Sequence, residues 1–159
     1  MAELRALCAG LGWADVATYI QSGNVVFTAP GKPTALEKIL QDAIAERFGF
    51  AAPVIVRTAA QWAEYPLANP FPKAAEDEPN RLLMLLSKGV PTEGAEDVIQ
   101  ARAVAGERVK RAGDALWFRY PEGVGTSKLT PSLIDRALGS AATGRNYRTV
   151  VTLLDMLRA

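Results

Sequence analysis

Three turns in this sequence hold polar side chains at spacings that could bind a ligand. The first turn is Gln21-Ser22-Gly23-Asn24, which lies between two predicted strands. Its side chains offer amide and hydroxyl groups around a flexible glycine, so they could hold a polar ligand at a hairpin tip. Serine, glycine and asparagine are also common turn residues, which gives the same peptide a purely structural interpretation. The sequence leaves both interpretations open.

The second turn is the glycine-rich run at residues 123–128, which comes before a predicted helix. It does not satisfy the phosphate-loop pattern, because that pattern needs G-x-x-x-x-G-K-[ST], with the lysine ahead of the hydroxyl. A weaker anion site stays open, since Ser127, Lys128 and Thr130 stand just before a helix N-terminus, where free N–H groups favour negative charge. The alternative is an ordinary capped helix that follows a loop.

The third turn, Thr143-Gly144-Arg145-Asn146, comes before the last predicted helix. Asn146 could cap this helix while Arg145 binds an anion or an acidic partner. Arg145 could equally form a surface ion pair with Asp135 or Asp155, and such a pair contributes little stability. The candidate ligand-binding residues from the three turns are Gln21, Ser22, Asn24, Lys128, Arg145 and Asn146.

The composition excludes several kinds of chemistry. Histidine is absent from all 159 residues, and Cys8 is the single cysteine. The chain therefore lacks the side chain that most often acts as a general base near neutral pH and most often binds metal ions. One cysteine allows neither an intrachain disulfide nor a cysteine-rich zinc site. No carboxylate pair or nucleophile–base set stands out, so the catalytic residues are unknown, and we expect neither a metal site nor a cofactor.

Charge is unevenly distributed along a nearly neutral chain of 18 basic and 17 acidic residues. Residues 60–101 have a net charge of −4, whereas residues 102–159 have a net charge of +5. Two solvated faces that attract each other would explain this pattern, and so would an anion-binding surface in the last third. The chain as a whole lacks the basic surplus that nucleic-acid-binding proteins usually show, so nucleic acid is a less favoured partner.

The sequence contains no recognisable membrane or export signal. No apolar stretch approaches the ~20 residues needed to cross a bilayer. The first residues lack the basic, apolar and small segments of a signal peptide. We therefore expect a cytoplasmic protein with no membrane partner.

The first half of the chain alternates helical and extended patterns. Capping boxes at Thr34–Glu37 and Thr58–Gln61 predict the starts of two helices, and Gly49 predicts the end of the first of them. The predicted elements, in order, are a helix at 2–11, hairpin strands at 16–20 and 24–28, a helix from 34 to 48 with Ile39 in its apolar stripe, a strand at 54–56 and a short helix to about 65.

The second half has a similar order. Its predicted elements are a central strand at 82–86, a helix from Thr92 to about 103, hairpin strands at 107–111 and 115–120, and helices that begin near 130 and 147. Alternation in the second hairpin strand places Trp117 and Arg119 on one face and Phe118 and Tyr120 on the other. We favour core packing for these aromatic residues over stacking on nucleic-acid bases, because the RRM pattern is absent.

The two halves match if one strand is missing before residue 2, since β-α-β-β-α-β is the ferredoxin-like arrangement. We therefore predict an α+β fold of two tandem ferredoxin-like (α-β plait) subdomains. The first covers residues 1–76, including a linker, and the second covers residues 77–159 with a C-terminal helix. The proline-rich, acidic stretch at 66–79 is the predicted boundary.

Three segments together carry a resemblance to a known family. They are MAELRAL followed by TYIQSGNVVF at residues 18–27, SKLT at residues 127–130, and TGRNYRTV at residues 143–150. In this order and spacing they resemble the DUF1697 family of bacterial proteins of unknown function, over nearly the whole chain. The resemblance implies two α-β plait subdomains and assigns no reaction.

The chain differs from that family at its start. Family members typically have an additional strand and a glycine-rich turn carrying an arginine, ahead of the segment that begins here at Met1. We therefore expect the first sheet to lack its N-terminal strand, whether Met1 is an internal methionine or the chain is a truncation. Loss of that strand would leave unpaired edges and fewer core contacts. An exposed edge could also pair two copies, so a homodimer is an open alternative.

Three functions remain open from the sequence. We favour a binding module for a small polar or anionic ligand at the junction of the two subdomains, where loop tips of both would converge. One alternative is an enzyme that works through Asp, Glu, Lys or Tyr instead of histidine. The other is a nucleic-acid-binding protein that uses the basic C-terminal third. The sequence does not decide whether the protein is an enzyme.

Overall fold

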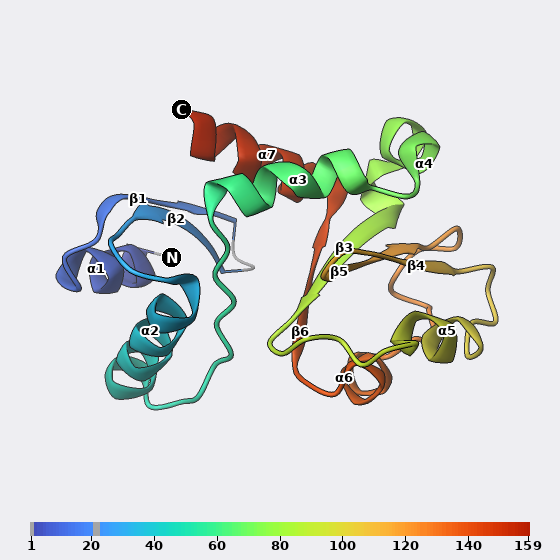
Figure 1. Cartoon of the computed structure of the whole chain (residues 1–159), viewed down its shortest axis with the longest axis horizontal. Helices are drawn as coiled ribbons and strands as arrows, with labels where there is room; N and C mark the ends of the chain where they lie inside the picture. The colour runs from blue at the N-terminus through green and yellow to red at the C-terminus, as the bar shows by residue number, and fades with distance from the viewer. Residues whose placement is uncertain (1, 21–22) are drawn as a thin grey trace. The chain divides into compact units, whose positions relative to one another are not determined.

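The computed structural model describes residues 2–20 and 23–159, and its chain divides into two compact units (Figure 1). One unit comprises the residues up to Ala59 together with Leu153–Ala159, and the other comprises Ala60–Thr152. Helices are combined with one two-stranded and one four-stranded antiparallel sheet. The predicted α+β fold class is confirmed, whereas the predicted boundary after residue 76 stays a prediction.

The second unit is built on an antiparallel sheet with the strand order β4-β5-β3-β6. Helix α5 joins β3 to β4, and helix α6 joins β5 to β6, which gives the β-α-β-β-α-β order of a ferredoxin-like plait. The central position of β3 agrees with its continuous apolar run. The elements are β3 (Leu82–Ser87), α5 (Ala95–Gln100), β4 (Arg108–Ala112), β5 (Ala115–Arg119), α6 (Pro131–Leu138) and β6 (Ala142–Asn146).

Strand β6 is absent from the prediction, which treated residues 143–146 as a turn before the last helix. Its sequence, Ala-Thr-Gly-Arg-Asn, has neither the β-branched content nor the alternation of a typical strand. The segment is a strand because it pairs with β3, with Leu83 opposite Asn146 and Ser87 opposite Ala142. Tertiary pairing, which the local sequence does not encode, therefore completes the sheet.

One face of the four-stranded sheet carries an apolar core beneath α5 and α6 (Figure 1). Phe118 and Tyr120 belong to this core and are almost fully buried. Thr130 is the N-cap of α6, and its hydroxyl accepts a hydrogen bond from the Leu133 N–H at 3.3 Å, as its position before Pro131 predicted.

The other face carries a row of four residues that oppose one another across the strands. In this row Lys110 of β4 lies opposite Trp117, Trp117 lies opposite Met84, and Met84 lies opposite Arg145 of β6. Because side chains alternate along a strand, Arg119 lies on the same face as Trp117, as predicted. This face of the sheet, named here the cationic face, therefore carries basic side chains from β4, β5 and β6.

Four further helical segments lie wholly or partly in this unit, and the two between residues 72 and 81 have no counterpart in the prediction. The Trp62 Nε1–H donates to the Val150 carbonyl oxygen at 3.0 Å and joins α3 to α7. The Tyr65 hydroxyl donates to Asp114 Oδ2 at 3.1 Å, in the turn between β4 and β5. The segments are α3 (Ala59–Ala68), α4 (Pro72–Asp77), the 3-10 helix η1 (Pro79–Arg81) and α7 (Tyr147–Arg158).

The first unit packs two helices against a two-stranded sheet. Its buried core consists of Cys8, Trp13, Leu36, Leu40 and Ile44. Trp13 and Phe27 stack with their ring centroids 4.1 Å apart, and burial raises the pKa of the Cys8 thiol. The elements are α1 (Ala2–Gly10), β1 (Ala14–Tyr19), β2 (Asn24–Thr28) and α2 (Pro33–Phe48).

Helix α2 differs from the prediction at its start and along one face. It begins at Pro33 with Lys32 as the N-cap, so Thr34 is not the capping residue. Proline at the first helical position fixes the entry into the helix without a capping side chain. Ile39 is 44% exposed and does not join the core. Gly49 ends the helix with φ 77°, as predicted.

The predicted strand at residues 54–56 does not form. In the second unit the equivalent last strand, β6, pairs with β3, the strand that comes before α5. Among the described residues, the sheet of the first unit consists of β1 and β2, which is one strand fewer than the three that the prediction gave it. Two side chains of α2 serve residues 54–56 instead. The Val54 N–H donates to Gln41 Oε1 at 2.9 Å and the Val56 N–H donates to Glu37 Oε2 at 3.5 Å.

Across the described residues, none of the helices combines the length and the apolar character needed to span a bilayer.

Replacing Gln41 by alanine should lower the free energy of unfolding by about 1 kcal/mol, because the Val54 N–H then loses its acceptor. The matched control is Asp42→Ala in the same helix, which removes only the exposed ion pair with Lys38. That change should cost about 0.5 kcal/mol or less. Urea unfolding and amide hydrogen exchange at Val54 measure the difference. Equal losses for both variants, with unchanged exchange at Val54, would contradict the role given to Gln41.

Candidate functional site

The first predicted turn is described only in part, because Gln21 and Ser22 lie outside the described residues. Asn24, the first residue of β2, is buried. Its Nδ2 donates to the Tyr19 carbonyl oxygen at 3.1 Å, across the hairpin. Asn24 therefore supports the joined ends of β1 and β2.

A buried carboxylate, that of Glu107, accepts a hydrogen bond from the second predicted turn. Glu107 is 2% exposed, and its Oε2 accepts a 2.6 Å hydrogen bond from the Ser127 hydroxyl. The same hydroxyl oxygen accepts from the Leu129 N–H at 3.1 Å, while the Ala105 N–H donates to Glu107 Oε1 at 2.7 Å. The Ser127 hydroxyl thus has a structural role, and exposed Lys128 is the charged group that this turn presents to solvent.

The protonation states of this cluster follow from its hydrogen bonds. The Ser127 hydroxyl lowers the pKa of Glu107 below the ordinary value of 4.5, burial acts in the opposite direction, and neighbouring backbone N–H groups lower the pKa further. Burial, assisted by the charge of Glu107, raises the pKa of Tyr120 to about 12. At neutral pH the carboxyl group is therefore ionised and the phenol is neutral.

The third predicted turn is the end of β6 and the start of α7. Arg145 Nη1 donates to the Thr143 hydroxyl at 2.6 Å and to the Gly144 carbonyl oxygen at 2.8 Å, and burial lowers the pKa of the guanidinium. Asn146 Oδ1 accepts from the Thr149 N–H at 3.0 Å, so Asn146 caps the first turn of α7 as predicted.

Within the second unit, the structure brings Arg145 and Asn146 together at the end of β6, whereas Lys128 lies apart from them. Arg145 lies in the row with Met84 and Trp117 on the cationic face. Lys128 lies in the loop that enters α6, beside Leu129 of the core on the opposite face.

A pocket that the sequence interpretation did not find lies on the cationic face. Its volume is about 470 Å³. Its lining residues are Pro70, Phe71, Pro72, Lys73, Ala74, Asp77, Glu78 and Arg119. One wall is the segment that contains α4, and the last residue of β5 contributes the single side chain from the sheet. The sequence offered one indication of this site, the charged Arg119 in an otherwise apolar strand. A charged residue in such a strand needs a polar environment.

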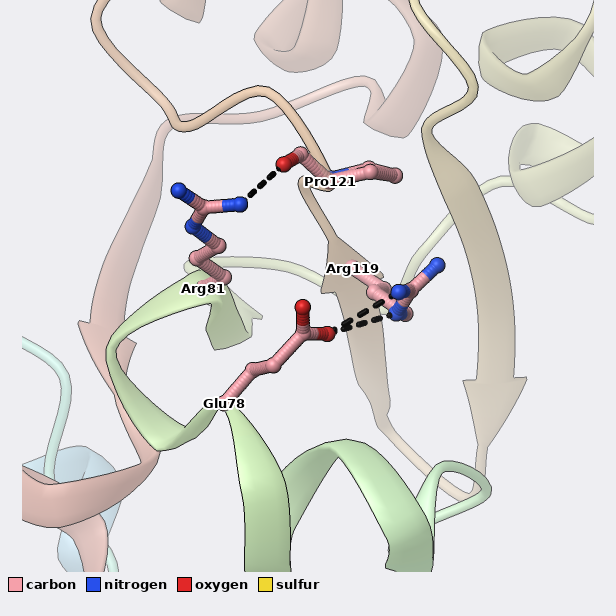
Figure 2. Close-up of polar contacts among 4 residues, drawn as sticks. All are labelled: Glu78, Arg81, Arg119 and Pro121. Carbon is pink, nitrogen blue, oxygen red and sulfur yellow. Dashed lines mark hydrogen bonds and ion pairs between the residues drawn. The ribbon is translucent and has the colours of Figure 1, made fainter.

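Arg119 and Glu78 form the central polar contact of the pocket (Figure 2). Arg119 Nη2 and Nε both donate to Glu78 Oε2, at 2.9 Å and 3.2 Å. The two side chains are 33% and 32% exposed, so the pair is accessible from solvent. Figure 2 also shows Arg81, which donates to the Pro121 carbonyl oxygen and holds the 3-10 turn against the end of β5.

Basic side chains of β4 border the pocket. Arg108 lies directly opposite Arg119 in the β4–β5 register, and Lys110 lies opposite Trp117. The Lys110 ammonium is 5.3 Å from the centroid of the Phe71 ring, which links the edge of the sheet to the pocket wall. The sheet side of the pocket therefore carries cations, whereas the α4 side carries Lys73 together with the carboxylates of Asp77 and Glu78.

The arrangement is suited to binding a charged molecule. The carboxylate at the centre of the pocket, Glu78, is paired with Arg119. Within residues 2–20 and 23–159, no group of three or more Cys, Asp or Glu side chains could hold a metal ion.

Comparison with known proteins gives a family match and a fold match. The model of DUF1697, a family described as proteins of unknown function, matches residues 1–117. A solved structure, the conserved bacterial protein SP0830 from Streptococcus pneumoniae, is similar with a TM-score of 0.73 and 18% sequence identity. That likeness covers 100% of this chain and 89% of the other, and at this identity it concerns the fold alone. No curated protein matches the sequence.

Acid should remove the stabilisation that Glu107 provides. Because its pKa is lower in the folded chain than its ordinary value, the contribution is complete above about pH 4.5 and is lost as the pH falls through the folded value. The wild-type protein should therefore lose stability between about pH 5 and pH 3, and Glu107→Gln should show a flatter profile. Ser127→Ala should lower the free energy of unfolding at pH 7 by about 1–3 kcal/mol.

Urea unfolding at a series of pH values measures these differences. The control is Glu122→Gln, which changes an exposed carboxylate of the same loop and should keep the wild-type slope. If Glu107→Gln and Glu122→Gln have the same pH profile, Glu107 does not stabilise the loop as an ionised group.

Proposed function

Because the chain belongs to the DUF1697 family, whose description assigns no reaction, we propose from the geometry of its second unit that it binds a small anionic molecule. The binding site is the pocket between residues 70–78 and Arg119. This proposal keeps the ligand class that the sequence favoured and places it at residues that the sequence interpretation did not select.

The environment of Arg119 is the observation that carries the proposal. Its guanidinium is the single sheet side chain in the pocket lining, and it has five N–H donors in a fork that fits a carboxylate or a phosphate. Glu78 engages two of its nitrogen atoms through one oxygen, which leaves Nη1 without a partner among the described residues. A bound anion could therefore share the guanidinium with Glu78.

The size and the wall of the pocket define the ligand further. A volume of about 470 Å³ lies within the range of roughly 300–1,000 Å³ that is typical of small-molecule sites. Pro70, Phe71 and Pro72 supply an apolar wall beside the charged groups. These features favour a small molecule that combines an apolar part with an anionic group.

Several properties remain predictions. A ligand site at the junction of the two subdomains is not part of the present proposal; its predicted residues are Gln21, Ser22, Asn24, Lys128, Arg145 and Asn146. A cytoplasmic location, self-association and a catalytic activity likewise stay predictions from the sequence. The exposed Arg108 and Lys110 on β4 favour nucleic acid as the second candidate partner, because exposed cations along a strand can contact phosphates.

Substitution of Arg119 should weaken anion binding in the pocket. In NMR titrations of the wild-type protein with benzoate and with inorganic phosphate, we expect saturable shifts of the Phe71, Lys73 and Arg119 amide signals. Arg119→Gln should weaken both probes by about tenfold or more, since a charge-assisted hydrogen bond contributes roughly 1.5–3 kcal/mol. Arg119→Lys, which keeps the charge but loses the fork, should bind with intermediate affinity.

The control for this experiment is Arg136→Gln, in α6 on the opposite face of the sheet, which should bind both probes as the wild type does. Circular dichroism spectra verify that each variant is folded. Absence of saturable shifts for both probes, or equal binding by Arg119→Gln and the wild type, would rule out this pocket as the anion site.

A further inference from the structure

The two arginines that face each other across β4 and β5 form an electrostatically unfavourable pair. Arg108 and Arg119 are direct cross-strand neighbours on the same face of the sheet. Like charges in directly opposite positions destabilise a strand pair. Glu78 offsets the charge of Arg119, whereas Arg108 has no polar partner among the described residues. An anion placed between the two guanidinium groups would remove this repulsion.

The charge of the pocket and its border indicates how many negative charges the ligand carries. The charged residues in question are Lys73, Asp77, Glu78 and Arg119 in the lining, with Arg108 and Lys110 beside it on β4. Four cations and two carboxylates leave a net charge of +2. A carboxylate ligand would neutralise half of this charge, whereas a phosphate monoester, at about −1.5 to −2 near pH 7, would neutralise almost all of it.

The positions of the cations also fit a tetrahedral group better than a planar one. Arg119 lines the pocket, Arg108 lies directly opposite it on β4, and Lys110 lies next to the Phe71 ring. Donors on two neighbouring strands can bond different oxygen atoms of a phosphate, which offers three acceptors where a carboxylate offers two. The apolar wall would hold the organic part of the ester.

We propose that the ligand is a small phosphate monoester, whose phosphate is bound jointly by Arg119, Arg108 and Lys110. This proposal rests on the proposed function, since it assigns a substrate class to the same pocket. It gives the exposed basic residues of β4 a role in specificity: they distinguish a dianion from a monoanion of similar size.

Phenyl phosphate and benzoate form a matched pair of probes, because they share a ring and differ in the anionic group. Isothermal titration calorimetry at pH 8 and low salt should show at least tenfold tighter binding of phenyl phosphate. Arg108→Gln and Lys110→Gln should each weaken phenyl phosphate several-fold and leave benzoate almost unchanged. Glu78→Gln should tighten phenyl phosphate, because it removes the carboxylate that competes for Arg119.

The matched control is Arg111→Gln, which changes a basic residue of the same strand on the opposite face and should leave both probes unaffected. If phenyl phosphate binds no more tightly than benzoate while Arg119→Gln still weakens both, the phosphate assignment is wrong and the anion pocket stands. If neither probe binds, both proposals fail. A single-stranded oligonucleotide that binds where phenyl phosphate does not would also overturn the assignment, in favour of a polynucleotide partner.

Discussion

The pairing of β3 on both of its sides determines the rest of the second unit. Because β5 and β6 flank this strand in register, Trp117, Met84 and Arg145 come to lie in one row although they are distant in sequence. The same register places Arg119 two residues beyond Trp117, at the end of β5, where the chain of α4 passes over the face. The pocket therefore exists because a central strand aligns its neighbours, and no local motif defines it.

In the first unit, residues 54–56 belong to no sheet. Backbone N–H groups that are removed from water must find acceptors, and residues 54–56 find theirs in the side chains of Glu37 and Gln41. Two side chains one helical turn apart thus supply acceptors that a neighbouring strand would otherwise provide. Each of these side chains must be fixed in one rotamer, which costs more conformational entropy than a backbone acceptor in an existing sheet.

Sequence predictions that depend on neighbouring residues succeeded more often than those that depend on contacts between distant residues. Caps and alternation depend on neighbours in the chain, and the sequence predicted them at Gly49, Thr130 and Asn146 and on both faces of β5, but not at the start of α2. Strand β6 forms through its pairing with the distant β3, although its own residues are not typical of a strand. Residues 54–56 have a β-branched pattern and form no strand. The contact of Glu78 with Arg119 joins residues 41 positions apart, and no spacing rule would have found it.

The three tryptophans occupy three separate environments, so their intrinsic fluorescence can report on each environment. Trp13 stacks on Phe27 in the first unit, and Trp62 bonds the backbone of α7. Trp117 is fully buried in the sheet, with its indole N–H unpartnered among the described residues. Emission from an indole depends on solvent access and hydrogen bonding. Variants that retain one tryptophan each would therefore reveal whether the two units melt together or one after the other.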